Sequence, residues 1–397
     1  MRLYYGWVIV GVSFLTLAVG GSTTASFSVY YVAILKEMGW SRADTALAFS
    51  LTMLVFALGG FPIGTLLDRF GPRRLLPAGA LVLGVGLLLS SGVTRLWELY
   101  LFYGVLVGLG ITLIGYIPTT VVISRWFERQ RATALGVGGA GRSLGNLLLL
   151  PFYQGLIAEL GWRSAYRLQA VLIAAVLIPL NLLLQRPPPQ RPGPPASPAG
   201  DEWTGPRAVR SVEFWLFTAL GFLGGINISA VTMHQVAFLV DQGYGAYLAA
   251  TIAGVLSVTS SAGNIAGGFL ADRWGRRAIY SLGAVAAAGG VVVLLLIQRD
   301  PLPLLPALYA ICYGLGFGMT GSVTTALHAD VFGGRHFGAI FGLIQLGSGL
   351  GGVLGPWLAG WIFDHLGSYA LAFLLILGNI LLRWAGVFAI MARAKIR

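Results

Sequence analysis

The chain has 397 residues, of which 56% are hydrophobic and 10% are charged, with a net charge of +12 and a mean hydropathy of +0.80. Soluble domains carry about 25% charged residues, so this composition excludes a soluble globular protein and indicates an integral membrane protein. Because Cys312 is the sole cysteine, the chain cannot form an intrachain disulfide.

Long apolar stretches recur from one end of the chain to the other. Each has about 20 residues or more, which is enough to cross ~30 Å of hydrocarbon. A spanning segment must satisfy its backbone hydrogen bonds internally, and barrel-type alternation is absent, so the spans must be helices. We predict an all-α integral membrane fold with twelve transmembrane helices, at residues 6–34, 44–67, 75–94, 97–124, 133–158, 164–184, 212–240, 246–270, 278–298, 303–328, 337–362 and 369–391.

A charged turn follows the second span and recurs after the eighth. Its two aspartates, Asp68 and Asp272, are 204 positions apart. Duplication at this period predicts two pseudo-symmetric six-helix bundles, an arrangement typical of transporters. The first copy contains Gly64, Asp68, Arg69, Gly71, Arg73 and Arg74, and the second contains Gly268, Asp272, Arg273, Gly275, Arg276 and Arg277.

The fifth and eleventh spans carry a second repeated pattern, at offsets of 205 or 206 residues. Its glycines have two interpretations: they allow static close packing of helices, or they form a smooth surface on which two halves rock. The sequence leaves both open. The pattern is Gly141, Gly145, Pro151 and Gly161 in the first half and Gly347, Gly351, Pro356 and Gly367 in the second.

A proline-rich segment at residues 186–200 separates the two sets of six spans. Proline removes backbone donors and fixes φ, so this segment is expected to be a semi-rigid exposed linker. We predict an N-terminal bundle at 1–185, a cytoplasmic linker at 186–210 and a C-terminal bundle at 211–397.

Basic residues are distributed unevenly between the two sides of the membrane. With the N-terminus inside, 18 Lys and Arg residues fall in cytoplasmic segments and 5 in external loops. The positive-inside rule then places both termini in the cytoplasm of a multi-pass protein of the cell (inner or plasma) membrane. Attraction to anionic membrane lipids accounts for the positive charge, so no nucleic-acid partner is predicted.

These features resemble the major facilitator superfamily, through the doubled turn, the twelve spans and the central linker. Further stretches resemble its monocarboxylate transporter and oxalate/formate antiporter branch. The resemblance implies secondary transport by alternating access, with spans five and eight meeting between the halves and a site near mid-membrane. The stretches are Trp126–Gly136, Phe214-Trp215, His234, Ser260–Asn264 and Gly355–Asp364.

The chain departs from that branch at two positions. Monocarboxylate carriers commonly place an arginine after the glycine matched by Gly263, where this chain has Asn264. Oxalate carriers place a lysine near the position of Leu346, and this chain has none there. A substrate anion must therefore find its positive partner elsewhere, or the substrate is not an anion.

Arg142 is the first candidate for that partner. It lies eleven residues beyond Arg131, about 16 Å along a helix, which places it near mid-depth in span five. An ionisable side chain there costs at least ~2.5–3.5 kcal/mol, so it is a functional candidate by default. Asn264, eight residues before Asp272, falls at a matching depth. The alternative is that Arg142 braces span five by bonding carbonyls of neighbouring helices.

His234 is the candidate for proton coupling as well as substrate binding, because histidine titrates near neutrality. Asn227 lies on the same helix face, seven residues earlier, and the repeat places Tyr30 at a depth similar to that of His234. A buried histidine that only satisfies hydrogen bonds is the alternative. Tyr116, Tyr313 and Gln345 are also predicted to line a polar cavity, with helix packing as their alternative role.

The remaining charged residues limit other mechanisms. All fourteen acids fall in loops or near span ends, which argues against a cation pump and against a relay of buried acids. Proton coupling would then use His234 or the substrate's own carboxylate. Arg167 and Arg383 are expected to snorkel toward span ends. The repeated turns are expected to act as a cytoplasmic gate, through carboxylates that meet helix N-termini and nearby arginines. The gating residues are Asp68, Arg69, Arg73, Asp272, Arg273 and Arg276.

We therefore predict a secondary transporter of a small, monocarboxylate-like organic anion, working by proton symport or anion exchange and functional as a monomer. No enzyme activity, cofactor or metal site is predicted, because phosphate-binding loops, metal-ligand spacing and hydrolytic triads are absent from the sequence. Two alternatives remain: an exporter of a neutral or amphipathic small molecule, with Arg142 structural, and a non-transporting membrane receptor with a carrier fold.

Overall fold

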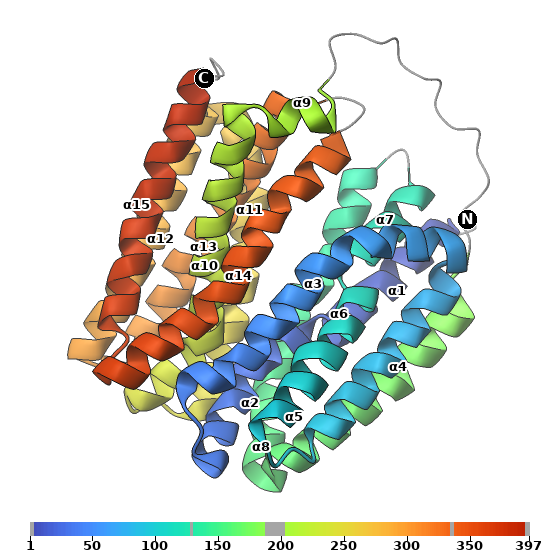
Figure 1. The fold of residues 1–397 in the computed structure, drawn as a ribbon, viewed down its shortest axis with the longest axis vertical. Helices are drawn as coiled ribbons and strands as arrows, with labels where there is room; N and C mark the ends of the chain where they lie inside the picture. The colour runs from blue at the N-terminus through green and yellow to red at the C-terminus, as the bar shows by residue number, and fades with distance from the viewer. Residues whose placement is uncertain (1–3, 128–129, 187–202, 334–336, 394–397) are drawn as a thin grey trace. The chain divides into compact units, whose positions relative to one another are not determined.

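The computed structural model describes residues 4–127, 130–186, 203–333 and 337–393 (Figure 1). Its regular structure is helical, and no strand occurs in these ranges. The prediction of an all-α membrane fold is confirmed. The predicted linker at 186–210 lies mostly outside the described residues, apart from the short helix α9 (Gly205–Val209).

Each predicted span coincides with one helix or with a run of consecutive helices, except that the fifth and sixth spans share α8. In the first half these are α1 (Tyr5–Val19), α2 (Ser22–Met38), α3 (Arg42–Phe70), α4 (Pro72–Ser90), α5 (Leu96–Leu99), the π-helix η1 (Tyr100–Val107), α6 (Gly108–Ile114), α7 (Tyr116–Trp126) and α8 (Arg131–Leu184). In the second half they are α10 (Val212–Asp241), α11 (Ala246–Trp274), α12 (Arg276–Arg299), α13 (Leu305–Phe332), α14 (Phe337–Leu366) and α15 (Ala370–Arg393).

Among the described residues, 10 helical stretches are long and apolar enough to cross a membrane. One of them, Thr133–Leu184, contains both the fifth and the sixth predicted span, because its helical conformation is interrupted at Gly161. The tenth predicted span is α13, which has 28 residues but falls outside those 10 stretches. Its many glycine, serine and threonine residues lower its hydropathy.

The chain divides into two compact units. Unit 1 comprises Met1–Arg191 together with Thr232–Val240 of α10 and Tyr244–Gly254, which lies mainly in α11. Unit 2 comprises Pro192–Val231, Asp241–Gly243 and Val255–Arg397. In unit 1, α8 packs against α1, α2 and α4, and in unit 2, α12 packs against α13 and α15.

The sequence repeat is also a backbone repeat. The glycine of the charged turn has φ of 73° at Gly71 and 88° at Gly275, and each residue directly precedes a helix. Gly161 and Gly367, the last glycines of the second pattern, have φ of 76° and 65°. Residues with a Cβ rarely adopt such positive φ values. The backbone conformation therefore explains why glycine recurs at these four positions.

The other glycines of the second pattern contact helices of their own unit. A Cβ on Gly141 or Gly145 of α8 would collide with the backbone of α1, at the carbonyls of Phe14 and Ala18. In the same way, Gly347 and Gly351 of α14 lie against the backbone of α10. Close packing within each bundle therefore accounts for these four glycines, as the static interpretation predicted.

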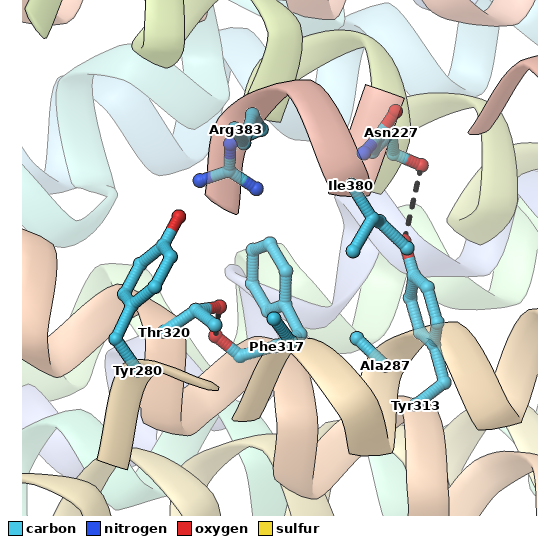
Figure 2. A pocket seen from close by; sticks show the side chains of 9 residues that line it. Asn227, Tyr280, Ala287, Tyr313, Phe317, Thr320, Ile380 and Arg383 are labelled. Atoms are coloured by element: carbon cyan, nitrogen blue, oxygen red, sulfur yellow. Dashed lines mark hydrogen bonds between the residues drawn. The ribbon is translucent and has the colours of Figure 1, made fainter. Parts of the chain in front are cut away.

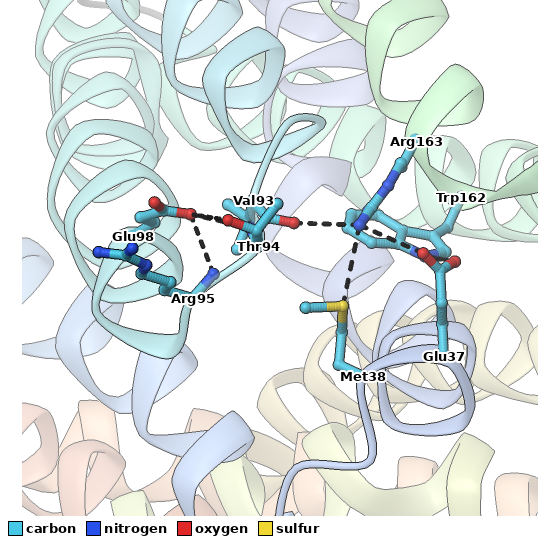
Figure 3. Close-up of polar contacts among 8 residues, drawn as sticks. All are labelled: Glu37, Met38, Val93, Thr94, Arg95, Glu98, Trp162 and Arg163. Atoms are coloured by element: carbon cyan, nitrogen blue, oxygen red, sulfur yellow. Dashed lines mark hydrogen bonds and ion pairs between the residues drawn. The ribbon is translucent and has the colours of Figure 1, made fainter.

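One end of unit 1 is held by a polar cluster at the Gly161 kink of α8 (Figure 3). The indole Nε1 of Trp162 donates to Oε2 of Glu37 at 2.6 Å, and the Arg163 guanidinium pairs with the same carboxylate at 3.2 Å. Arg163 also donates to the carbonyl of Val93 at 3.1 Å. These contacts join α8 to α2 and to the loop after α4.

In the same view, the carboxylate of Glu98 caps the start of α5. It accepts hydrogen bonds from the backbone N–H of Thr94 at 2.8 Å and of Arg95 at 3.0 Å. These hydrogen bonds pair two backbone donors that precede the first turn of α5.

Candidate functional site

Arg142 lies on α8 in unit 1, and its side chain is exposed. Among the described residues it has no hydrogen-bond or ion-pair partner. The hydroxyl of Tyr116, a residue that is 51% exposed at the start of α7, lies within electrostatic reach of the guanidinium. The Tyr116 ring packs beside Gly139, one turn before Arg142, where a Cβ would lie at an ordinary contact distance of 3.7 Å from it.

This geometry bears on the two roles considered for Arg142. A bracing role requires hydrogen bonds to carbonyls of neighbouring helices, and the described structure contains none from this side chain. A guanidinium that keeps its donors free in a spanning helix is instead available to a planar anion, which it can hold through two parallel hydrogen bonds. Arg142 and Tyr116 are thus two predicted site residues that the fold brings together.

The imidazole of His234 is 2% exposed and meets the ring of Tyr31 edge to face, with 5.5 Å between ring centroids. Both residues belong to unit 1. Tyr30 is fully buried and stacks on Tyr166 at 3.8 Å, and its hydroxyl has no hydrogen-bond partner in the described structure. Tyr30 is therefore a core residue of unit 1 beside the His234 contact.

Two predicted residues of unit 2, Asn264 and Gln345, have exposed side chains on α11 and α14. Neither amide forms a hydrogen bond with another described residue. The Nδ2 atom of Asn264 lies beside Gly321 of α13, 3.8 Å from where a Cβ would be. Both amides are free to bind a ligand, as Arg142 is.

Asn227 and Tyr313, predicted to line a polar cavity, do meet in unit 2 (Figure 2). The Tyr313 hydroxyl donates to the Asn227 carbonyl at 3.4 Å, and both residues line a small pocket with Arg383. Asn227 lies in unit 2, whereas His234, which was expected on the same helix face, is grouped with unit 1.

The prediction that Arg383 snorkels to a span end is wrong. Its side chain lines the pocket within unit 2, and its Nε atom is buried without a hydrogen-bond partner. The sequence did contain a signal. Arg383 precedes Arg393, the last residue of α15, by ten positions, or about 15 Å of helix, which is nearly the separation used to place Arg142 at mid-depth.

The predicted gate residues have varied surroundings. The guanidinium of Arg73 donates to the carbonyl of Leu182 at 2.8 Å, while that of Arg69 lies over the Phe70 ring at 5.4 Å. The side chain of Asp68 lies outside the described part of the structure.

In the second copy of the charged turn, the aspartate does not pair with the neighbouring arginines as the motif suggested. Asp272 and Arg273 are exposed and have no hydrogen-bond or ion-pair partner among the described residues. Arg276 instead forms an ion pair with Asp330, near the end of α13. Sequence reasoning missed Asp330 because the partner of Arg276 comes from another helix, 54 positions away in the chain. Within the described ranges, no group of three or more His, Cys, Asp or Glu side chains is arranged to hold a metal ion.

Solved structures share this fold at low sequence identity. The nucleoside transporter NupG matches with a TM-score of 0.77 and 15% identity, covering 98% of this chain and 99% of NupG. The D-xylose-proton symporter matches with a TM-score of 0.75 and 16% identity, covering 97% of both chains. At these identities the likeness concerns the fold alone.

Relatives by sequence are more specific. Monocarboxylate transporter 13 of Bos taurus is 29% identical, covering 96% of this chain and 88% of that protein. Monocarboxylate transporter 11 of Mus musculus is 30% identical, covering 93% of this chain and 84% of that protein. The profile of the Major Facilitator Superfamily matches residues 12–356 and 252–393. The chain therefore belongs to the major facilitator superfamily and is a multi-pass membrane transporter related to the monocarboxylate transporters.

Proposed function

We propose that this protein transports a small monocarboxylate-like anion by alternating access, and that Arg142 binds the substrate carboxylate. The observation that carries the proposal is the state of the Arg142 side chain. It is exposed on a membrane-spanning helix, and no described residue neutralises it or accepts its hydrogen bonds. A charge in that position is costly unless a ligand pairs with it during the transport cycle.

Tyr116 supports this assignment because it lies beside the guanidinium. Its hydroxyl adds one more hydrogen-bond donor for the oxygens of a bound carboxylate. Asn264 and Gln345 supply free amides in unit 2. The relatives named as monocarboxylate transporters support the substrate class. We infer that Arg142 takes the binding role for which those carriers commonly use the arginine that Asn264 replaces here.

Coupling is proposed to be proton symport or anion exchange, with His234 as the proton-carrying group. The described spans bury two imidazoles, those of His234 and His328. His328 lies four residues from the end of α13, and the acids of the sequence fall in loops or near span ends, so His234 is the proposed carrier. Both termini are proposed to be cytoplasmic in the cell membrane, from the 18-to-5 distribution of basic residues. A monomer is proposed as the working form.

The test is counterflow of lactate-like anions in proteoliposomes that contain the purified protein. Replacing Arg142→Gln removes the charge and the fork, and we expect the rate to fall by roughly 10- to 100-fold, the equivalent of losing about 1.5–3 kcal/mol of charged hydrogen bonding. Arg142→Lys keeps the charge but not the planar fork and should recover only part of the rate.

The matched control is Arg167→Gln, which removes another exposed arginine of α8 that already has a partner, Ser91 Oγ at 3.2 Å. Its counterflow rate should stay close to that of the parent. Parent-like counterflow in Arg142→Gln would refute the carboxylate role. Transport of neutral compounds but not of monocarboxylates would favour the exporter alternative, and binding without counterflow would favour the receptor.

A further inference from the structure

Unit 2 contains a small pocket of its own, formed by α10, α12, α13 and α15 (Figure 2). Its volume is about 20 Å³, which is enough for about one water-sized occupant. Arg383 of α15 and Tyr280 of α12 point toward each other across it, and Asn227 of α10 and Tyr313 of α13 form another side. The mechanism proposed above does not use this pocket.

The pocket holds a positive charge with no counter-charge. None of its nine lining residues is acidic, and the Nε atom of Arg383 is buried with no hydrogen-bond partner in the described structure. In the described part of unit 2, Asp330 and Glu213 are paired with Arg276 and Arg393, not with Arg383. Arg383 is half-buried, and an unpaired charge within a membrane-spanning bundle is unfavourable, so an anion in the pocket would stabilise it.

A second unused donor lies on the same pocket. Asn379 donates through one nitrogen, Nδ2, to the carbonyl of Leu223 at 3.1 Å and to Oδ1 of Asn227 at 2.8 Å. Because a carbonyl must be an acceptor, the first bond identifies that atom of Asn379 as nitrogen, and the second then identifies the acceptor of Asn227 as its oxygen. The Nδ2 atom of Asn227, which is 2% exposed, is left as a donor without a partner.

The hydroxyls of the pocket do not satisfy the guanidinium by themselves. Thr320 donates to the carbonyl of Gly316 within its own helix at 3.0 Å, and Tyr313 donates to Asn227 O at 3.4 Å. Tyr280 lies within electrostatic reach of Arg383. A hydroxyl oxygen can accept from the guanidinium but carries no full negative charge. Among the nine lining residues the unused capacity is therefore cationic and donating, which selects an anion. The unpartnered Oδ1 of Asn379 belongs to a residue outside that lining.

Arg383 packs against a glycine of a neighbouring helix. The internal repeat shows that the fold does not require an arginine at this position. A Cβ on Gly224 of α10 would lie 2.9 Å from Cζ of Arg383, so the guanidinium packs against this glycine and would have to shift if the residue were larger. With the repeat offsets of 205 and 206 residues, the counterparts of Arg383 in the first half are Ile178 and Leu177, both aliphatic. An aliphatic side chain at the equivalent place of the other bundle is buried in its core, as Leu177 is.

We propose that the Arg383 pocket binds one compact monovalent anion of the size of chloride, which neutralises the guanidinium and stabilises unit 2. The available volume matches a single-atom ion and leaves no room for the body of an organic acid. Arg383 supplies the charge, and the Nδ2 of Asn227 supplies a second hydrogen bond. The site is separate from Arg142, which belongs to unit 1.

The test measures thermal unfolding of the purified full-length protein in detergent, titrated with sodium chloride against sodium gluconate at constant ionic strength. We expect chloride to raise the Tm saturably, by a few degrees at concentrations well above Kd. Bromide should give the same rise, and gluconate, which is too large for the pocket, should give none. In Arg383→Leu, which copies the aliphatic counterpart, the protein should fold and its Tm should not respond to chloride.

Three further variants make the result specific. Asn227→Ala should shift the chloride half-saturation point upward by roughly tenfold, as for the loss of one hydrogen bond to a charged group. Arg167→Gln and Arg142→Gln should keep the parent's chloride response, which separates this site from the transport site. In crystals soaked in bromide, anomalous scattering should place a peak beside Arg383.

A chloride response that persists in Arg383→Leu, or that is absent from the parent, would overturn the proposal. So would stabilisation that depends on Arg383 and is produced by lactate but not by chloride, because that would make the pocket a seat for the substrate carboxylate. Should Arg383→Leu fail to fold, the bromide peak and the Asn227→Ala shift still decide the matter.

Discussion

His234 is buried beside an aromatic polar residue in unit 1. It is 2% exposed, and the residue that it contacts is Tyr31, whose hydroxyl donates to the Arg42 carbonyl at 2.9 Å. A histidine in such a place either satisfies fixed hydrogen bonds or gains and loses a proton during the cycle. Transport measurements with and without a pH gradient distinguish these roles. If His234 carries the proton, transport driven by the gradient depends on its titration, whereas a histidine with fixed hydrogen bonds contributes nothing to that coupling.

We predict that His234→Gln loses the stimulation of uptake by a pH gradient while counterflow of the same monocarboxylate continues. Glutamine retains hydrogen bonding but does not titrate between pH 5 and 8, which is the physical reason for the split. Tyr31→Phe is the control, since it keeps the ring that faces the imidazole and should preserve the gradient response. If His234→Gln responded to the gradient as the parent does, His234 would have only a structural role.

Single polar residues were the part of the site that the sequence predicted least completely. Depth along a helix can be counted from a charged residue at its end, and this arithmetic predicted that Arg142 lies near mid-depth of a span. That its donors are free was learned from the structure. The direction of a side chain depends on which helices surround it, and no count of residues provides that. Arg383 therefore was expected to snorkel although it faces the pocket of unit 2, and Asp330 was not recognised as the partner of Arg276.

Helix pairs that contact through glycine are the clearest structural consequence of the internal repeat. Gly145 of α8 lies against the backbone of Ala18 in α1, and its counterpart Gly351 of α14 lies against the backbone of Phe222 in α10. The two contacts involve corresponding helices of the two halves. The sequence could locate these glycines but not their partners, so it left rigid packing and a sliding surface equally open.

We predict that Gly145→Ala destabilises the protein, because the new methyl group would collide with the Ala18 carbonyl rather than with a movable side chain. Overpacking of this kind costs typically about 1–3 kcal/mol and should appear as a lower Tm in detergent. Gly351→Ala should behave in the same way.

The control is Gly136→Ala on the same helix, where a Cβ would meet nothing within 4 Å. Alanine favours a helix over glycine by about 0.8–1.0 kcal/mol, so this variant should keep or raise the Tm. Equal Tm changes in Gly145→Ala and Gly136→Ala would contradict the close approach of α8 and α1.

The fold as a unit was the most predictable level, because its causes are distributed over the sequence. Hydrocarbon thickness sets the length of every span, and the same period relates Gly71 to Gly275 and Gly161 to Gly367, whose positive φ values repeat in the structure. An error in one span would not have changed the count of the others. The binding side chains have no such redundancy, since each depends on one rotamer and one set of neighbours.

Orientation in the membrane follows from charge rather than from packing, so it is a separate prediction for the entire chain. Cytoplasmic loops retain Lys and Arg during insertion, and the assignment with 18 of these residues inside and 5 outside is the one that satisfies this bias. We predict that the segment at residues 186–200 faces the cytoplasm and that the loop between α12 and α13 faces outward. Because Cys312 is the sole cysteine, Cys312→Ser provides a background for testing both with single reporters.

In that background, Asp300→Cys should react with a membrane-impermeant maleimide in intact cells, because Asp300 is exposed directly after α12. Ser197→Cys should react only in inverted vesicles or after permeabilisation. Retained counterflow in each variant would show that the reporters had not altered insertion. The reverse labelling pattern would mean that the 18 basic residues lie outside. The asymmetry would then need a cause other than insertion, and the gating role proposed for the arginines of the repeated turns would pass to the external side.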